Sequence, residues 1–453
     1  IIIFGMIFLG YFLFSFYINK KEFKIAITKE DEEYNKELEK DKDLFKVFKE
    51  IPFDNLFLLF WFLIIAFAAR NAFRILFIFV PIVSILVSFF LIYIYDFYSQ
   101  TNDKLLKFFS FSLLILLIFM PFVQGSLVND AIKIIEKAKS VNSIFDPQWQ
   151  NTMKFVRENT PTESVFSNWW DYGYLIQTFG ERATLSDGGN ARGGINYYIG
   201  RYLLTGKNRA EALGLLRTHN ATHLLITSEE IGKYLSFSSI ASDENMDRRS
   251  HIPIFVLNPE IKKETYPNKT VVFSYLYKGA FYLEEDLIFN GKFFPTGKAV
   301  ILGSIVSFRD SGGEISIKQP IIVVSYNGVM EEIPLNCLYF QNTEYVFSNN
   351  GLNSYGGCLR IIPSVNENTE VNNLGASLFL SQKVRNSFFT QLYLFDKDEA
   401  TSEEFKGFNK IYDGTQQGFG LIYDERFKKV WGPIKIWGLS YDSSIKINSS
   451  LLN

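Results

Sequence analysis

Residues 166–176, FSNWWDYGYLI, place two tryptophans, an aspartate and a tyrosine next to one another. The carboxylate of Asp171 accepts hydrogen bonds and a tryptophan indole donates one, so together they can hold a small hydroxyl group. A charge-assisted hydrogen bond of this kind contributes about 1.5–3 kcal/mol. A site built around a hydroxyl also strongly rejects ligands that lack it. Trp169, Trp170 and Asp171 are therefore candidates for binding the side chain of a serine or threonine.

Gly173 follows this cluster, and its conformational freedom would let the backbone turn so that the side chains share one face. The alternative is an aromatic corner of a core, in which Asp171 caps a helix. The residues themselves leave both interpretations open.

Other local motifs give little support to competing functions. The sequence has no GxSxG, P-loop or CxxC motif, which leaves hydrolase and nucleotide-binding functions without local support. The net charge of −2 argues against a nucleic-acid partner.

His219 and His223 precede a buried strand, where we expect a structural role. Cys337 and Cys358 can form a disulfide in an oxidising compartment, but the low cysteine content favours two free buried thiols.

The pattern from residue 127 to 280 alternates between helix and strand, which indicates an α/β arrangement. Helical spacing over 146–161 ends at Pro161, and the segment 164–180 that contains the tryptophans predicts a strand, a turn and a helix. Residues 194–227 predict two helices that lead into a buried strand at 223–227.

The next segment, 281–370, changes to short runs of period two that are broken by Gly and Asn-Gly turns. This pattern predicts a β-sandwich or a barrel-like module. Helical spacing returns over 376–396, and 433–441 predicts a strand.

The N-terminal part contains four apolar segments, each about long enough to cross a bilayer core of ~30 Å. They cover residues 1–17, 54–69, 72–95 and 106–125. The loop at 18–53 contains nine lysines, and Lys and Arg mark cytoplasmic loops, so we expect everything after residue 126 on the outer face.

Arg74 lies inside the third apolar segment. An arginine at membrane depth is costly and usually faces a protein interior or a polar ligand. The alternative is that its long side chain reaches the nearby outer interface.

The sequence WWDYG at 169–173, preceded by VRENTPTESVFSN and followed by TLSDGGN, closely resembles the oligosaccharyltransferase catalytic-subunit family, in particular its archaeal AglB branch. The resemblance extends to DPQWQNTMKFVRENTP and to the run GRYLLT…EALGLLR…ATHLLIT. It implies a multi-span α-helical membrane part over 1–126, followed by an extracytoplasmic α/β core. That core would consist of 127–280 and 371–453, with 281–370 as an inserted β-rich module.

In this family the first three residues of WWDYG hold the hydroxyl at position +2 of an Asn-X-Ser/Thr acceptor. The resemblance carries this role to Trp169, Trp170 and Asp171, and the motif is completed by Tyr172 and Gly173.

A second family element is a DxxKxxxM-type helix that lines the same pocket, and EEIGKYLSF matches it with Glu230, Lys233 and Phe237. The sequence departs from the pattern with Glu for Asp and with Phe for Met or Ile. The alternative is a plain surface helix with a Glu–Lys pair. Arg74 matches the family's arginine near the lipid-linked phosphate, where a guanidinium would serve as a counter-charge.

The reaction that the resemblance implies is transfer of a glycan from dolichol phosphate or diphosphate to the asparagine amide nitrogen, with Mn²⁺ or Mg²⁺ as Lewis acid. No acidic pair lies at an outer membrane boundary, so we expect the metal ligands and catalytic carboxylates upstream of Ile1. The chain would then be the distal part of a multi-pass cell-membrane glycosyltransferase that works as a single subunit. Its partners would be the lipid-linked oligosaccharide, Asn-X-Ser/Thr polypeptides and the membrane, but no nucleic acid.

Two alternatives use the same residues. A membrane-anchored protein that lacks catalysis could retain WWDYG for capturing a peptide. A structural membrane subunit could use WWDYG only for packing, in which case removing the Asp171 carboxylate would cost stability and not peptide binding.

Overall fold

The computed structural model describes residues 53–71, 75–119, 127–140, 145–191, 193–258, 264–265, 270–310, 315–347 and 354–452. The chain forms two compact units, Ile1–Asn142 and Ser143–Asn453.

The described part of the first unit is helical. Its elements are α4 (Phe53–Asn71), α5 (Leu76–Gln100), α6 (Lys104–Phe119) and α7 (Leu127–Ser140). Among the described residues, α5 is the helix that is both long and apolar enough to cross a membrane, and the apolar stretch Leu56–Arg70 of α4 is shorter. The predicted span at 1–17 lies outside the described residues. One described helix, Leu76–Gln100, thus has the length and composition of a span, and the four-span membrane part stays a prediction.

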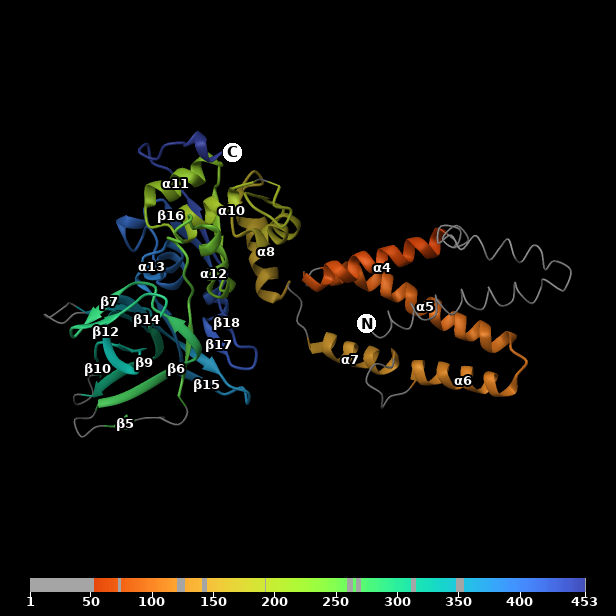
Figure 1. The fold of residues 1–453 in the computed structure, drawn as a ribbon. Coiled ribbons are helices and arrows are strands. Elements are labelled where there is room, and N and C mark those ends of the chain that lie inside the picture. The colour runs from red at the N-terminus through yellow and green to blue at the C-terminus, as the bar shows by residue number, and fades with distance from the viewer. Residues whose placement is uncertain are drawn as a thin grey trace. The chain divides into compact units, whose positions relative to one another are not determined.

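The second unit begins with an α/β part, which lies above the barrel in Figure 1. Its sheet has the order β16-β19-β3-β1-β2, in which β1 is parallel to β2 and β3, while β19 is antiparallel to β3 and β16. These strands are β1 (Val165–Ser167), β2 (Ala183–Thr184), β3 (His223–Ile226), β16 (Phe408–Asp413) and β19 (Lys435–Leu439). All four residues of β3 are buried, which confirms the strand predicted there.

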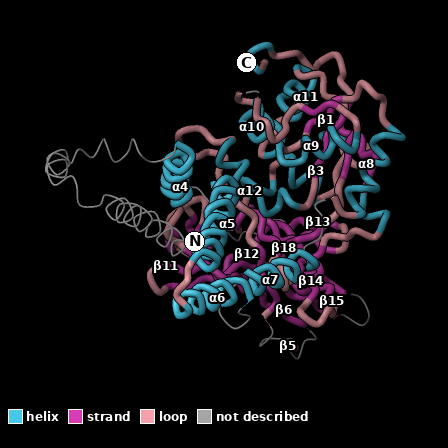
Figure 2. The backbone as a smooth tube through the Cα atoms, turned by 90° about the vertical axis from the view of Figure 1, so that its right-hand side faces the viewer, coloured by secondary structure: helices cyan, strands magenta, loops and turns pink. Residues whose placement is uncertain are grey.

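Helices surround this sheet, and Figure 2 shows them beside the strands. The first helix starts at Pro147, where the carboxylate of Asp146 accepts a hydrogen bond from the backbone N–H of Trp149 at 2.9 Å. This helix ends at Asn159, shortly before Pro161. The α-helices are α8 (Pro147–Asn159), α9 (Gly173–Leu175), α10 (Ile195–Tyr198), α11 (Arg209–Thr218), α12 (Glu229–Ile240) and α13 (Gln382–Arg385). Short 3₁₀ or π turns are η2 (Trp170–Tyr172), η3 (Ile176–Gly180), η4 (Ile199–Leu204), η5 (Phe389–Leu394), η6 (Glu403–Phe405), η7 (Gly414–Gln417) and η8 (Ser449–Leu451).

The rest of the second unit is a barrel. Strands β12, β11, β9, β6, β4, β15 and β14 pair in that order, and β14 pairs back onto β12, so the sheet closes on itself. The ring strands are β4 (Ile254–Leu257), β6 (Thr270–Tyr282), β9 (Val300–Asp310), β11 (Ile321–Tyr326), β12 (Val329–Phe340), β14 (Tyr355–Val365) and β15 (Val371–Leu380). The remaining strands are β5 (Glu264–Thr265), β7 (Leu287–Phe289), β8 (Lys292–Phe294), β10 (Ile315–Ile317), β13 (Thr343–Val346), β17 (Ile422–Asp424) and β18 (Lys429–Trp431).

The barrel uses strands on both sides of the predicted module at 281–370: β4 and β6 mostly precede it, and β15 follows it. The division of the core at 280 and 371 stays a prediction. The prediction of a helix over 376–396 was wrong for its first part. Ala376 to Leu380 belong to β15 and pair with β14 and β4.

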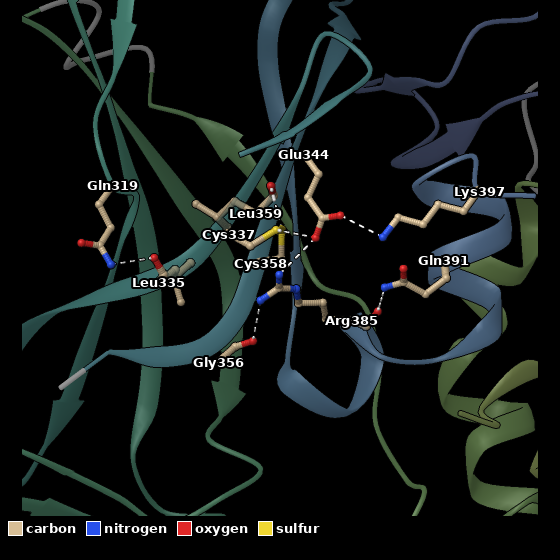
Figure 3. The surroundings of a disulfide bond; sticks show 10 residues. All are labelled: Gln319, Leu335, Cys337, Glu344, Gly356, Cys358, Leu359, Arg385, Gln391 and Lys397. Atoms are coloured by element: carbon tan, nitrogen blue, oxygen red, sulfur yellow. Dashed lines mark hydrogen bonds and ion pairs between the residues drawn. A yellow bond between two sulfur atoms is a disulfide. The ribbon is translucent and has the colours of Figure 1, made fainter. Parts of the chain in front are cut away.

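A disulfide joins Cys337 of β12 to Cys358 of β14. The two residues are register partners in the strand pair that closes the barrel, so the bond lies at the closure (Figure 3). Beside it, Glu344 forms ion pairs with Arg385 and Lys397. The expectation of two free thiols was wrong, because barrel closure brings the two strands together.

Candidate functional site

The WWDYG segment leaves β1 and turns sharply. Trp169 is extended, with φ −69° and ψ 139°, and the 3₁₀ turn η2 follows at once. Trp169 is only 2% exposed and its ring lies 5.7 Å from that of Phe237. Tyr172 is also buried, and its ring stacks on Trp149 at 5.5 Å. These two rings anchor the turn, whereas Trp170 and Asp171 stay partly exposed.

Asp171 faces a lysine from α12. Its Oδ2 lies 3.2 Å from Lys233 Nζ, and the two side chains are 27% and 31% exposed. The same ammonium donates to Tyr172 Oη at 3.0 Å and pairs with Glu229 at 3.3 Å. The structure therefore brings Asp171 and Lys233 together, 62 positions apart in sequence, and Asp171 forms this ion pair instead of a side-chain cap on η2.

A third segment reaches the same place from near the end of the chain. Lys429 of β18 pairs with Glu229 Oε1 at 2.9 Å, and its ammonium lies 4.3 Å from the ring centre of Trp431. Burial alone would raise the pKa of Glu229, but the hydrogen bonds and charges of Lys429 and Lys233 outweigh it and lower that pKa. Sequence reasoning missed Glu229 and Lys429. Glu229 could have been found from its spacing of four residues from Lys233 on one helix. Lys429 could not, because its contact with Glu229 joins distant parts of the sequence.

Glu230 has a different role from the one that the family pattern suggests. Its side chain is fully buried, and Oε2 accepts hydrogen bonds from the amide and the hydroxyl of Thr227 at 3.1 and 2.6 Å. Burial raises the pKa of Glu230 to about 8. In this structure its carboxyl group holds the start of α12 and is not exposed to a peptide.

Phe237 is also completely buried, and its ring contacts Trp169, Tyr234 and Phe389. It therefore supports Trp169 from behind, and none of its own surface is open to an acceptor. The larger ring in place of Met or Ile is accommodated by this aromatic cluster.

Gly173 does not need the conformational freedom of glycine, because its φ of −55° and ψ of −48° are ordinary helical values. It needs the absence of a side chain. A Cβ atom there would lie 2.3 Å from the carbonyl oxygen of Ser186 and 2.5 Å from Cβ of Asp187. The SDGGN loop at 186–190 thus packs directly on the motif. Asn168 fixes the loop by donating to the Ser186 carbonyl at 3.1 Å.

Two predicted features fall elsewhere. Arg74 lies outside the described residues. In the part of the chain that the structure describes, no three His, Cys, Asp or Glu side chains are grouped so that they could hold a metal ion. The described residues thus supply no site that fits the expected Mn²⁺ or Mg²⁺.

Residues 162–279 match the model of the "STT3/PglB/AglB core domain". This stretch of the chain is therefore similar to that core domain. The matched range includes WWDYG, the SDGGN loop and α12, and it confirms the resemblance to the AglB-like oligosaccharyltransferases.

Curated relatives match over this core. A dolichyl-phosphooligosaccharide-protein glycotransferase 1 of Pyrococcus furiosus is 36% identical over 80 residues, which is 17% of this chain and 8% of that protein. A dolichyl-phosphooligosaccharide-protein glycotransferase of Methanocaldococcus jannaschii is 31% identical over 78 residues, again 17% and 8%. The matches thus span less than a tenth of the length of these relatives. The apo oligosaccharyltransferase of Archaeoglobus fulgidus is a structural neighbour, with 14% identity, 80% coverage of this chain, 35% coverage of that chain and a TM-score of 0.42.

Proposed function

We propose that this chain is the distal part of a membrane oligosaccharyltransferase. The whole enzyme would transfer a glycan from dolichol phosphate or diphosphate to the asparagine of Asn-X-Ser/Thr sequons. The observation that carries the proposal is the Asp171–Lys233 pair, which lies within the STT3/PglB/AglB core domain. The names of the curated relatives support the reaction class.

In this proposal, Asp171 accepts a hydrogen bond from the acceptor's +2 hydroxyl. Lys233 orients the carboxylate, and Lys233 is itself fixed by Tyr172 Oη and Glu229. Trp170 supplies an apolar wall, while Trp169, behind it, keeps the turn in place. Lys429 would hold the other carboxylate oxygen of Glu229 and so keep Glu229 beside Lys233.

The remaining parts of the reaction stay predictions. Arg74 would be the counter-charge for the lipid phosphate, and Mn²⁺ or Mg²⁺ would be bound by carboxylates upstream of Ile1. α5 would be one of several membrane spans, and the second unit would lie outside the cytoplasm.

The test is peptide binding by the whole chain purified in detergent. We expect an Asn-X-Thr peptide to bind about ten- to a hundredfold more tightly than the matched Asn-X-Val peptide, which corresponds to one charge-assisted hydrogen bond. Asp171→Asn should remove most of this difference. Asp247→Asn is the control, because Asp247 forms a comparable surface ion pair with Arg201 at 3.1 Å.

Equal affinity of the two peptides for the unmodified chain would contradict the proposed hydroxyl contact. Selective binding by a longer chain that includes the upstream sequence, without glycan transfer in the presence of Mn²⁺ and lipid-linked glycan, would favour the alternative of an inactive sequon-binding protein.

A further inference from the structure

A cavity of about 660 Å³ lies in the second unit, between the outer face of the barrel and the α/β part. Strands β12, β14 and β15 form one wall, and segments around Tyr393, Leu421 and Pro433 form the other. Its size falls within the usual range for small-molecule sites. None of the residues proposed to contact the acceptor lines it.

Arg360 of β14 lines this cavity without a polar partner. Its Nε and Nη1 atoms are buried and make no hydrogen bond in the described structure. The contact that it does make is with a ring, since its Cζ lies 4.6 Å from the centre of Tyr339. Burial lowers the pKa of Arg360. Buried donors without acceptors are rare in folded proteins and call for an explanation such as an absent ligand.

The charges around Arg360 are out of balance by one. Lys435 pairs with Asp396 at 2.7 Å, and Lys410 pairs with Asp396 at 2.7 Å and with Asp413 at 3.3 Å. The two lysines thus pair with both carboxylates. Among the described ion pairs none includes Arg360, so its positive charge is the one left over.

The other lining groups indicate what the ligand would carry besides a negative charge. Gln341, Asn342 and Asn373 have amides that both donate and accept hydrogen bonds, as hydroxyl groups require. Tyr339 and Phe340 offer apolar ring surface. An inorganic anion would use the arginine and leave the amides and rings without a partner.

We propose that this cavity binds a hydroxylated ring that bears a carboxylate, of which a hexuronate is the simplest example. The carboxylate would lie on the Arg360 guanidinium, whose planar geometry suits two parallel hydrogen bonds. The ring hydroxyls would contact the amides, and one could donate to Asp396.

The test is calorimetric titration of the whole chain in detergent with D-glucuronate, with D-glucose and inorganic phosphate as parallel probes. We expect saturable binding of D-glucuronate and at least tenfold weaker binding of the other two. Arg360→Met should lower the affinity for D-glucuronate at least tenfold. Arg426→Met is the control, because Arg426 is paired with Asp424 at 2.6 Å and does not line the cavity.

Two further measurements separate binding from folding. Arg360→Met should melt at the same temperature as the unmodified chain or higher, because it removes a charge that is in none of the described ion pairs and two buried donors that make no hydrogen bond. Asn373→Asp, at an exposed position of the rim, should weaken D-glucuronate binding at least tenfold by repulsion while keeping the fold. Absence of saturable D-glucuronate binding, or equal binding of phosphate, would overturn the proposal. No acceptor peptide takes part, so the outcome is independent of the proposed sequon contact.

Discussion

Two adjacent glutamates at the start of α12 have opposite environments. Glu229 is partly exposed and paired with two lysines, which lower its pKa. Glu230 is fully buried, holds the backbone and hydroxyl of Thr227, and has its pKa raised to about 8. A single step along a helix turns a side chain by about 100°, so neighbouring carboxylates can face solvent and core respectively.

The raised pKa of Glu230 predicts a pH dependence of stability. Between the ordinary value of 4.5 and about 8, the folded chain keeps a proton that the unfolded chain has released. The free energy of unfolding therefore falls as pH rises through this window. Glu230→Gln should remove that part of the fall, which is on the order of a few kcal/mol.

Urea unfolding in detergent, followed by tryptophan fluorescence at pH 5 and pH 8, measures this difference. Glu229→Gln is the control. Because the pKa of Glu229 is lowered in the fold, its ionised form stabilises the fold mainly above pH 4.5. Glu229→Gln should therefore change the free energy of unfolding by a similar amount at pH 5 and pH 8. An unchanged pH dependence in Glu230→Gln would mean that Glu230 is ionised in the folded chain.

At the scale of elements, local signals predicted some parts of the fold and not others. The helix at 147–159 follows from Asp-Pro at its start and a Pro after its end, and the buried strand 223–226 follows from its apolar run. β15 was misread because residues 375–380 are buried on both faces, between the barrel core and the α/β core. A segment that is buried on both faces has no period that separates strand from helix.

Some contacts of the candidate site could likewise be predicted from the sequence and others could not. The resemblance assigned WWDYG and the helix that carries Lys233 to the same pocket, and the structure brings Asp171 and Lys233 together. Burial of Glu230 and the arrival of Lys429 depend on tertiary packing, and the Cys337–Cys358 bond depends on which strands close the barrel. None of these three is determined by neighbouring residues.

The contact between Gly173 and the SDGGN loop gives a prediction for these two elements. Gly173→Ala should lower the free energy of unfolding by about 1–3 kcal/mol or more, because its Cβ would overlap the Ser186 backbone and rigid atoms must move. It should also weaken Asn-X-Thr peptide binding, since displacing the loop disturbs the turn that carries Asp171.

The matched substitution is Gly232→Ala on α12, where an added Cβ meets nothing within 4 Å. Alanine favours a helix over glycine by about 1 kcal/mol, so this variant should be as stable as the original or slightly more stable. Thermal unfolding in detergent compares the two. A Gly173→Ala chain as stable as Gly232→Ala would show that the loop moves away at little cost.

At the scale of the second unit, distant parts of the chain complete one another. The central strand β3 has β1 on one side and β19, more than two hundred residues later, on the other. Trp437 of β19 is fully buried in the core that includes Trp169 and Phe237. Likewise β4 pairs with β15, so the barrel cannot close without the later strands.

This arrangement predicts that the matched core, although recognisable in sequence, does not fold alone. A fragment of residues 143–280 contains all of the match at 162–279, but it exposes one edge of β3 and lacks Trp437, which is fully buried in the same core. Such a fragment should show no cooperative thermal transition by circular dichroism and should be digested rapidly by protease. The fragment 143–453, which is a compact unit by its contacts, should melt cooperatively. If 143–280 melts at the temperature of 143–453, then β19 and the barrel add little to the core, and Lys429 would be an accessory contact and not part of the folded site.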